Sequence, residues 1–251
     1  MKIAYLCSED DLNSIFVETI KKYNVELNVF IENNTNNKKN IIKKKLQNSN
    51  IFKKLFFPFD VLSLYIYKYI IKRYINKKLS FKSSFGSEDY IFRTKDINSI
   101  DVFNKISNFR PDIIIIRGTT IIKEPLISYN TQYFLNIHGA VVPNYRNVHG
   151  QFWSFYFKDF DNMGSSVLHL TKGIDNGNVA LMEKLNEKPL NLRDLHVKTI
   201  ILSNKLIDKI ISTYLKENII QSTIQNQLTT SFYGTTPTFL NFIQLFIKRN
   251  K

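Results

Sequence analysis

The sequence predicts an α/β fold, a doubly wound and mostly parallel sheet with a basic helical insertion and a short C-terminal extension. The chain opens with a β-α-β pattern, and the four isoleucines at 113–116 are typical of a strand buried on both faces. At 251 residues the chain can bury a sizeable core, and its single cysteine, Cys7, cannot form an internal disulfide. These features exclude a small disulfide-stapled module and favour a reducing compartment.

Short apolar runs and helical spacings define the elements in order. The expected strands share β-branched or aromatic runs, and they are 2–7, 26–31, 90–93, 112–117, 133–138, 165–170 and 179–184. The expected helices share apolar residues three and four apart, and they are 12–23, 102–109, 151–158 and 192–216. Ser99 or Asp101 caps the second helix and Pro111 ends it. The stretch 139–150 and the loop 171–178 are irregular, and 218–251 is a mixed tail.

The net charge of +14 is concentrated in one segment. Residues 35–83 hold 13 Lys or Arg and one acid, Asp60, so they carry +12 and the rest of the chain carries only +2. We predict that this segment is helical, is interrupted near Pro58, and packs on the domain through apolar residues three and four apart. These residues are Phe52, Leu55, Phe56, Phe59, Leu62, Tyr65, Ile66, Tyr69, Ile70 and Tyr74. Contact with anionic lipid, nucleotide phosphates or RNA stays open as an alternative.

The sequence also indicates where the protein works. The longest uncharged stretch in the basic segment, 61–67, is far shorter than the roughly 20 apolar residues that span a bilayer. The N-terminus turns acidic at Glu9-Asp10-Asp11 and lacks the features of a signal peptide. We therefore expect a cytoplasmic protein with no transmembrane segment.

Several function classes leave no motif in the chain. There is no G-x-G-x-x-G, no P-loop, no G-x-S-x-G elbow and no H-E-x-x-H, so nothing supports a dinucleotide enzyme, an NTPase, a serine hydrolase or a zinc protease. The four histidines do not show the spacing of metal ligands, and we expect no metal.

The side chains best suited to catalysis lie at the end of the expected strand 133–138 and in a loop after it. Asn136 and His138 alternate to the same side of that strand, and Asp175 lies in a glycine-flanked loop, Gly173–Gly177. An amide donor, an imidazole and a carboxylate at one strand end are suited to acyl transfer. Taken singly, each residue also fits a plain role, as a satisfied polar pair and a turn residue.

These elements resemble the folate-dependent formyltransferases, and most of all the sugar N-formyltransferases of surface-polysaccharide synthesis. The resemblance rests on the Asn-x-His strand, on Pro143-Asn144-Tyr145-Arg146 and on the Gly-Ile-Asp-Asn-Gly loop, and it covers about residues 93–184. It implies a Rossmann-like formyltransferase core in 1–185 that contains the insertion 35–83. Residues 186–251 are then a C-terminal helix and a short extension, a candidate dimerisation element.

The resemblance also implies roles. Asn136 stabilises the oxyanion, His138 transfers a proton, and Asp175 orients His138. The formyl donor is N10-formyltetrahydrofolate, with no metal, and its pterin lies against two segments. Its contacts are Thr120, Ile121, Ile122, Lys172 and Asp175.

Substrate contacts are expected from Tyr145 and Arg146. Two departures from the family pattern concern the site: Asn147 follows Arg146 where glycine is commoner, and His169 comes one residue late on its strand, so that it faces the other side.

The acceptor is expected to be a nucleotide-linked amino sugar, such as dTDP-4-amino-4,6-dideoxyglucose, in O-antigen and lipopolysaccharide synthesis. The acids Glu9–Asp11 stand where relatives that act on a ribonucleotide carry a glycine-rich phosphate loop, and the tail is shorter than the extra domain of the tRNA enzymes. The partners expected are therefore this sugar, the folate donor and a second copy, with no nucleic acid. Two alternatives stay open: a methionyl-tRNA formyltransferase-like enzyme that uses 35–83 for RNA, and a non-catalytic binding or membrane-surface protein on the same fold.

Overall fold

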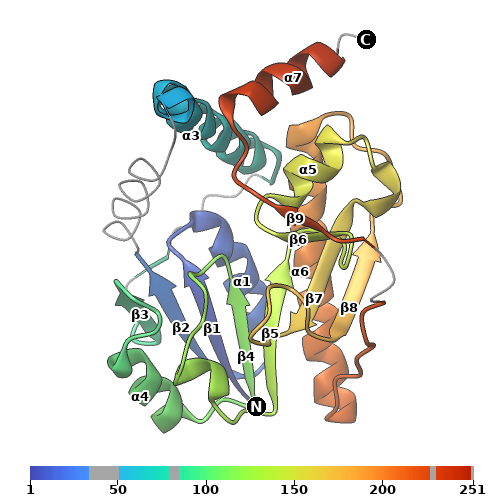
Figure 1. Cartoon of the computed structure of the whole chain (residues 1–251). Coiled ribbons are helices and arrows are strands. Elements are labelled where there is room, and N and C mark those ends of the chain that lie inside the picture. Colours follow the sequence, from blue (N-terminus) through green and yellow to red (C-terminus); the bar gives the residue numbers. More distant parts are fainter. Residues whose placement is uncertain (34–50, 80–84, 87, 227–229, 250–251) are drawn as a thin grey trace.

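A seven-stranded sheet organises the molecule (Figure 1). The computed structural model describes residues 1–33, 51–79, 85–86, 88–226 and 230–249. The strand order is β3-β2-β1-β4-β5-β7-β8; the five strands from β3 to β5 are parallel, and β7 and β8 are antiparallel to their neighbours. The strands are β1 (Lys2–Ser8), β2 (Glu26–Glu32), β3 (Ile91–Thr94), β4 (Ile113–Arg117), β5 (Tyr133–His138), β7 (Gly164–His169) and β8 (Val179–Lys184). The predicted mostly parallel sheet is confirmed.

Helices cover both faces of this sheet. On one face, α1 (Ser14–Lys21) and α6 (Leu192–Glu217) bury Phe16, Ile20 and Leu206 against the strands. On the other face, α4 (Ile100–Phe109) packs Val102 and Ile106 against alternate residues of the same strands. Because α6 contributes to the main core, the chain after residue 185 packs against the sheet.

Caps and breakers act where the local sequence predicts them. The Ser99 side chain accepts a hydrogen bond from the Val102 backbone N–H at the start of α4. Asn191 caps α6 in the same way, through the Asp194 N–H. Short 3₁₀ turns lie at Asp11–Asn13, Leu126–Ser128 and Phe160–Asn162.

A second, two-stranded sheet ties the tail to the middle of the chain. Strand β6 (Tyr145–Asn147) pairs in parallel with β9 (Phe232–Gly234), and α5 (Gly150–Tyr156) packs beside them. Phe152 and Trp153 of α5 are buried in an aromatic cluster that α7 (Phe239–Arg249) completes with Phe242. Strand β9 and helix α7 of the tail therefore pack directly against β6 and α5.

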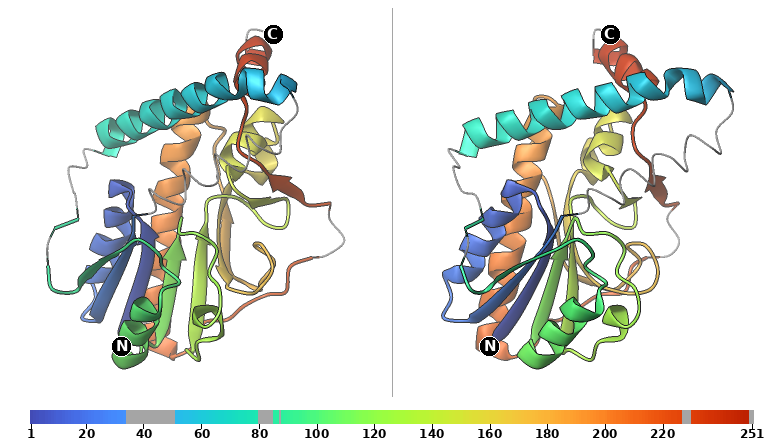
Figure 2. Two further views of the ribbon diagram at one scale, coloured as in Figure 1. Left: turned by 60° about the vertical axis from the view of Figure 1, so that its left-hand side comes forward. Right: turned by 90° about the vertical axis from the view of Figure 1, so that its left-hand side faces the viewer.

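The basic segment forms one long helix, α3 (Ile51–Leu79), beyond the carboxyl ends of the parallel strands (Figure 2). It runs without a break through Pro58, so the predicted interruption is wrong. Pro58 lies inside the helix, where it removes one backbone N–H donor while the helix continues on both sides of it. The rest of the predicted insertion, 35–50 and 80–83, lies outside the described residues.

The face of α3 that packs is also different from the predicted one. Ile71 and Ile75 are buried against Leu12, Val197 and Ile200. Most of the predicted stripe is exposed instead, namely Leu55, Phe59, Leu62, Tyr65, Ile66, Tyr69 and Ile70. Both faces of this helix are apolar, so spacing alone cannot identify the one that packs. In the part of the chain that the structure describes, no helix combines the length and the apolar character needed to cross a membrane.

Candidate active site

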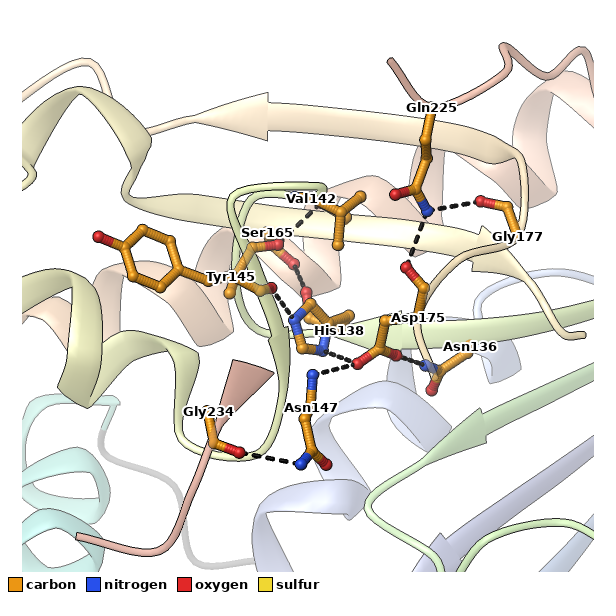
Figure 3. A network of polar contacts seen from close by, with 12 residues as sticks. Asn136, His138, Val142, Tyr145, Asn147, Ser165, Asp175, Gly177, Gln225 and Gly234 are labelled. Atoms are coloured by element: carbon orange, nitrogen blue, oxygen red, sulfur yellow. Dashed lines mark hydrogen bonds and ion pairs between the residues drawn. The ribbon is translucent and has the colours of Figure 1, made fainter. Parts of the chain in front are cut away.

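Three predicted residues meet at the carboxyl end of β5 (Figure 3). The Asn136 Nδ2 donates to Asp175 Oδ1 at 2.9 Å, and the His138 Nδ1 lies 3.5 Å from Asp175 Oδ2. The side chains of His138 and Asp175 are only 9% and 10% exposed. An amide, an imidazole and a carboxylate therefore lie together in a largely buried position, in which electrostatic interactions are stronger than in water.

The proton on His138 is constrained by its second contact. The Nε2 atom lies 2.8 Å from the backbone carbonyl of Tyr145, which can only accept a hydrogen bond. Nε2 therefore carries hydrogen, and a neutral ring would present its lone pair on Nδ1 to the Asp175 carboxylate. Nδ1 is therefore the ring atom left to accept a proton, and it faces the Asp175 carboxylate.

The loop that carries Asp175 is braced from the tail. Asp175 has a φ of 47°, in the left-handed region, and Gln225 Nε2 donates to the carbonyls of Asp175 and Gly177 at 2.9 and 2.7 Å. A Cβ on Gly177 would lie 1.8 Å from the His169 carbonyl, so this position accepts only glycine without a shift. The backbone thus holds the carboxylate in a fixed place.

Asn147 adds a contact that sequence reasoning missed. Its backbone N–H donates to Asp175 Oδ2 at 2.7 Å, and its Nδ2 donates to the Gly234 carbonyl at 2.9 Å. Its φ of 67° lies in the left-handed region that glycine and asparagine tolerate best. Asn147 replaces the glycine of the family pattern and keeps the backbone conformation that glycine would adopt. An asparagine in place of this glycine was the sequence feature that could have predicted the left-handed conformation.

The predicted substrate contacts, Tyr145 and Arg146, are held within the protein. Tyr145 is buried in the aromatic cluster and its hydroxyl donates to Asp159 Oδ2 at 2.8 Å; burial raises the pKa of this phenol. The guanidinium of Arg146 donates to Gln225 and Tyr233, while its buried Nε has no hydrogen-bond partner among the described residues. Arg146 thus joins the tail to the site and keeps one unused donor.

The predicted donor-binding segment follows β4. The Thr120 N–H and hydroxyl both donate to the buried carboxylate of Glu32, each at 2.8 Å, so these donors are committed to the fold. Ile122 is buried in the core, whereas the side chain of Ile121 is 70% exposed. Glu32 ends β2 and was not foreseen as the residue that holds this segment.

Lys172 joins the two segments assigned to the donor. Its Nζ lies 3.1 Å from Glu124 Oε1, and both side chains are largely exposed. A hydrogen bond from Ser128, with the neighbouring Lys172, lowers the pKa of Glu124. This ion pair brings the segment after Thr120 against the loop that carries Asp175.

His169 lies on the opposite side of the sheet from the candidate site. The β5–β7 register pairs His138 with Ser166 and Leu135 with His169, and residues paired in this way share a face. Burial lowers the pKa of His169, which packs against the ring of Tyr133. The register agrees with the predicted orientation. No group of three or more His, Cys, Asp or Glu that could hold a metal ion occurs in the part of the chain that the structure describes.

Comparisons with known proteins give one fold and more than one acceptor. No family model matches the chain. A methionyl-tRNA formyltransferase of Finegoldia magna is 28% identical over 128 residues, which are 50% of this chain and 41% of that protein. The chain thus matches less than half the length of this curated relative.

Two solved structures are similar over most of the chain. An N-formyltransferase from Helicobacter canadensis, in complex with folinic acid and dTDP-3-aminofucose, has a TM-score of 0.60 at 13% identity, and the match covers 100% of this chain and 83% of that one. A 4-N formyltransferase from Francisella tularensis has a TM-score of 0.59 at 16% identity, with 92% of this chain and 76% of that one covered. The chain has the formyltransferase fold, as the resemblance implied.

Proposed function

We propose that this protein transfers the formyl group of N10-formyltetrahydrofolate to the amine of a nucleotide-linked amino sugar. The contact of Asn136 and His138 with Asp175 carries the proposal. Acyl transfer to an amine needs a donor for the developing oxyanion and a group that takes a proton from the amine, and these residues supply both.

Each side chain has a definite part in that chemistry. The amine nitrogen attacks the formyl carbon, and the formyl oxygen becomes negative. Asn136 has a second Nδ2–H, with no partner among the described residues, which stabilises this oxygen. The His138–Asp175 pair takes the proton that leaves the amine and returns a proton to the folate nitrogen as the carbon–nitrogen bond breaks, so charge and atoms balance.

The segments around Thr120 and Lys172 fit the folate donor. The Lys172–Glu124 ion pair brings them together, and the exposed side chain of Ile121 offers an apolar contact for a flat heterocycle. Glu32 accepts from the backbone N–H and the hydroxyl of Thr120, so this segment is held in place without a bound donor. The buried side chain of Ile122 anchors this segment to the core.

An amino sugar is favoured as acceptor over a tRNA. The solved relatives from Helicobacter canadensis and Francisella tularensis match most of this chain, and the first is in complex with a dTDP-linked amino sugar. Arg146, whose guanidinium lies beside Tyr233 of the tail, is the residue we assign to the sugar nucleotide, with Tyr145 supporting it. We propose dTDP-4-amino-4,6-dideoxyglucose as the first candidate.

A direct assay tests the proposal. The purified protein is incubated with N10-formyltetrahydrofolate and dTDP-4-amino-4,6-dideoxyglucose, and the product is read as a mass gain of one formyl group. The control variant is Asp161→Asn, an exposed carboxylate outside the site. We expect transfer in the wild type and the control, and its loss in His138→Ala. A dTDP-linked 3-amino sugar is tested in parallel. Absence of transfer to both the 4-amino and the 3-amino sugar would contradict the proposal.

Methionyl-tRNA is the second candidate acceptor, because the Finegoldia magna relative formylates it by name. The same assay with initiator methionyl-tRNA separates the two. Transfer to tRNA that falls steeply with salt would favour the RNA acceptor, since basic residues bind phosphates through counterion release. Salt-tolerant transfer to the sugar alone would favour the first proposal.

The setting of the reaction is also a proposal. We place it in the cytoplasm, consistent with the buried free thiol of Cys7, and in the synthesis of a surface polysaccharide such as O-antigen. A homodimer through the C-terminal extension is expected, and light scattering of the purified protein tests it.

A further inference from the structure

Helix α3 has two apolar faces, and the protein covers only one of them. Tyr67, Ile71 and Ile75 point inward, against α5, α6 and α7. The opposite face presents Leu55, Leu62, Tyr65, Ile66 and Tyr69. Leu62, Tyr65 and Tyr69 are 55%, 68% and 55% exposed. An apolar row of this length is unusual on a monomer surface and marks an interaction site.

Helix α7 extends the same surface. It packs beside α3, with Phe59 against Phe239, and both helices lie at one end of the molecule in every view (Figures 1 and 2). Leu240, Phe246 and Ile247 of α7 are exposed, and Phe246 is 67% exposed. We call the outward residues of α3 and α7 the end face.

The charged side chains of α3 are basic with one exception. The only acid of α3 is Asp60, and its carboxylate accepts a hydrogen bond from the Phe239 backbone N–H. The last turns of α3 present Lys72, Arg73, Lys77 and Lys78 to solvent, with only Lys72 in an ion pair, to Asp11, among the described residues.

We propose that the end face binds an anionic lipid membrane, with α3 lying in the plane of the interface. Exposed leucines, isoleucines and tyrosines beside a cluster of lysines and arginines are the combination that enters the headgroup region of an anionic bilayer. The helix lies on the membrane and does not cross it, consistent with the absence of a spanning helix among the described residues.

Charge and side-chain chemistry separate this partner from two others. A second copy docked face to face through α3 would bring like charges together, which costs free energy. A homodimer through other parts of the C-terminal extension leaves this face of α3 free. A nucleic acid would use the cations and could stack on the tyrosines, but Leu55, Leu62 and Ile66 would have no function there. Anionic lipid uses both the charges and the aliphatic side chains.

Vesicle sedimentation tests the proposal with matched variants. Full-length protein is mixed with vesicles of pure phosphatidylcholine and with vesicles that contain phosphatidylglycerol as the anionic lipid. The apolar variant is Leu62→Glu, Tyr65→Glu and Tyr69→Glu. Its control makes the same change in charge at exposed sites outside the end face, and it is Ile100→Glu, Leu215→Glu and Ile219→Glu. A charge variant is Arg73→Gln, Lys77→Gln and Lys78→Gln.

We expect the wild type and the control to bind anionic vesicles, and the apolar and charge variants to bind about 100-fold more weakly. Circular dichroism and formyl transfer in solution confirm that the variants are folded, and neither readout depends on the vesicle result. Equal binding of the apolar variant and the control would overturn the proposal. So would a dimer in light scattering that only the apolar variant abolishes, or binding to an oligonucleotide without binding to vesicles.

Discussion

Asp175→Asn is the sharpest test of the candidate site, because it changes one charge and almost no volume. The carboxylate accepts from Asn136 Nδ2 at 2.9 Å and from the Asn147 N–H at 2.7 Å, and it faces His138 Nδ1 at 3.5 Å. The carboxamide that replaces the Asp175 carboxylate in this variant has one acceptor oxygen. Its NH₂ group must therefore face either Asn136 Nδ2 or the Asn147 N–H, which are both donors. Asn136 can restore that contact only by turning its amide over, which withdraws the N–H assigned to the oxyanion.

The expected magnitudes follow from these contacts. One buried donor left without an acceptor costs about 1–3 kcal/mol of the free energy of unfolding. Loss of the proton-transfer pair lowers kcat by about 10²- to 10⁴-fold. The matched control, Asp161→Asn, removes an exposed carboxylate elsewhere and leaves both quantities unchanged.

Two measurements separate a catalytic role from a structural one. Urea unfolding gives the stability, and formyl transfer at saturating substrates gives kcat. A folded Asp175→Asn protein with kcat within about twofold of the wild type would refute the assignment, because no proton-transfer role survives that result. A loss of stability alone would assign Asp175 to loop structure.

Three further predictions address the surroundings of the site. Burial holds the pKa of His196 at about 3, whereas an unfolded histidine titrates near pH 6.5, so the unfolded chain binds the extra proton and urea midpoints should fall as pH drops from about 6.5 to 4. His196→Gln should flatten that decline, and an unchanged slope would contradict the buried neutral histidine. Asn147→Gly should keep kcat within about threefold, whereas Asn147→Val should destabilise the fold by about 1–2 kcal/mol because of its φ of 67°, and equal melting of the two variants would argue against backbone strain. Glu32→Gln leaves either the Thr120 or the Ile97 backbone N–H without an acceptor and should raise KM for the folate donor about tenfold, with a smaller change in the KM of the sugar; an equal rise in both would place Glu32 in the general fold.

The sequence predicted the fold because the sheet depends on local patterns. The isoleucines at 113–116 and the capped helix after Ser99 needed no information from distant residues. Helix α3 was harder, because its apolar residues satisfy two opposite faces. Only the positions of Leu12 and Val197, set by the folded core, decide that Ile71 and Ile75 turn inward.

The candidate site was predictable in part for the same reason. Strand alternation places Asn136 and His138 on one side, and glycines mark the Asp175 loop. Gln225 and the Gly234 carbonyl reach the site from 50 and 87 residues away, and nothing local in the sequence indicates such a contact. Asn147 carried a signal, an asparagine where the backbone needs a left-handed conformation.

The pairing of β6 with β9 has a consequence for the order of events in the cell. A ribosome releases the N-terminal β-α-β unit early, and those strands can pair while synthesis continues. The contacts that brace the site of His138 and Asp175 are complete only after Gly234 has left the exit tunnel, because Asn147 Nδ2 donates to the Gly234 carbonyl. These bracing contacts join residues far apart in the sequence, so we expect a newly made chain to form its parallel sheet before they are in place.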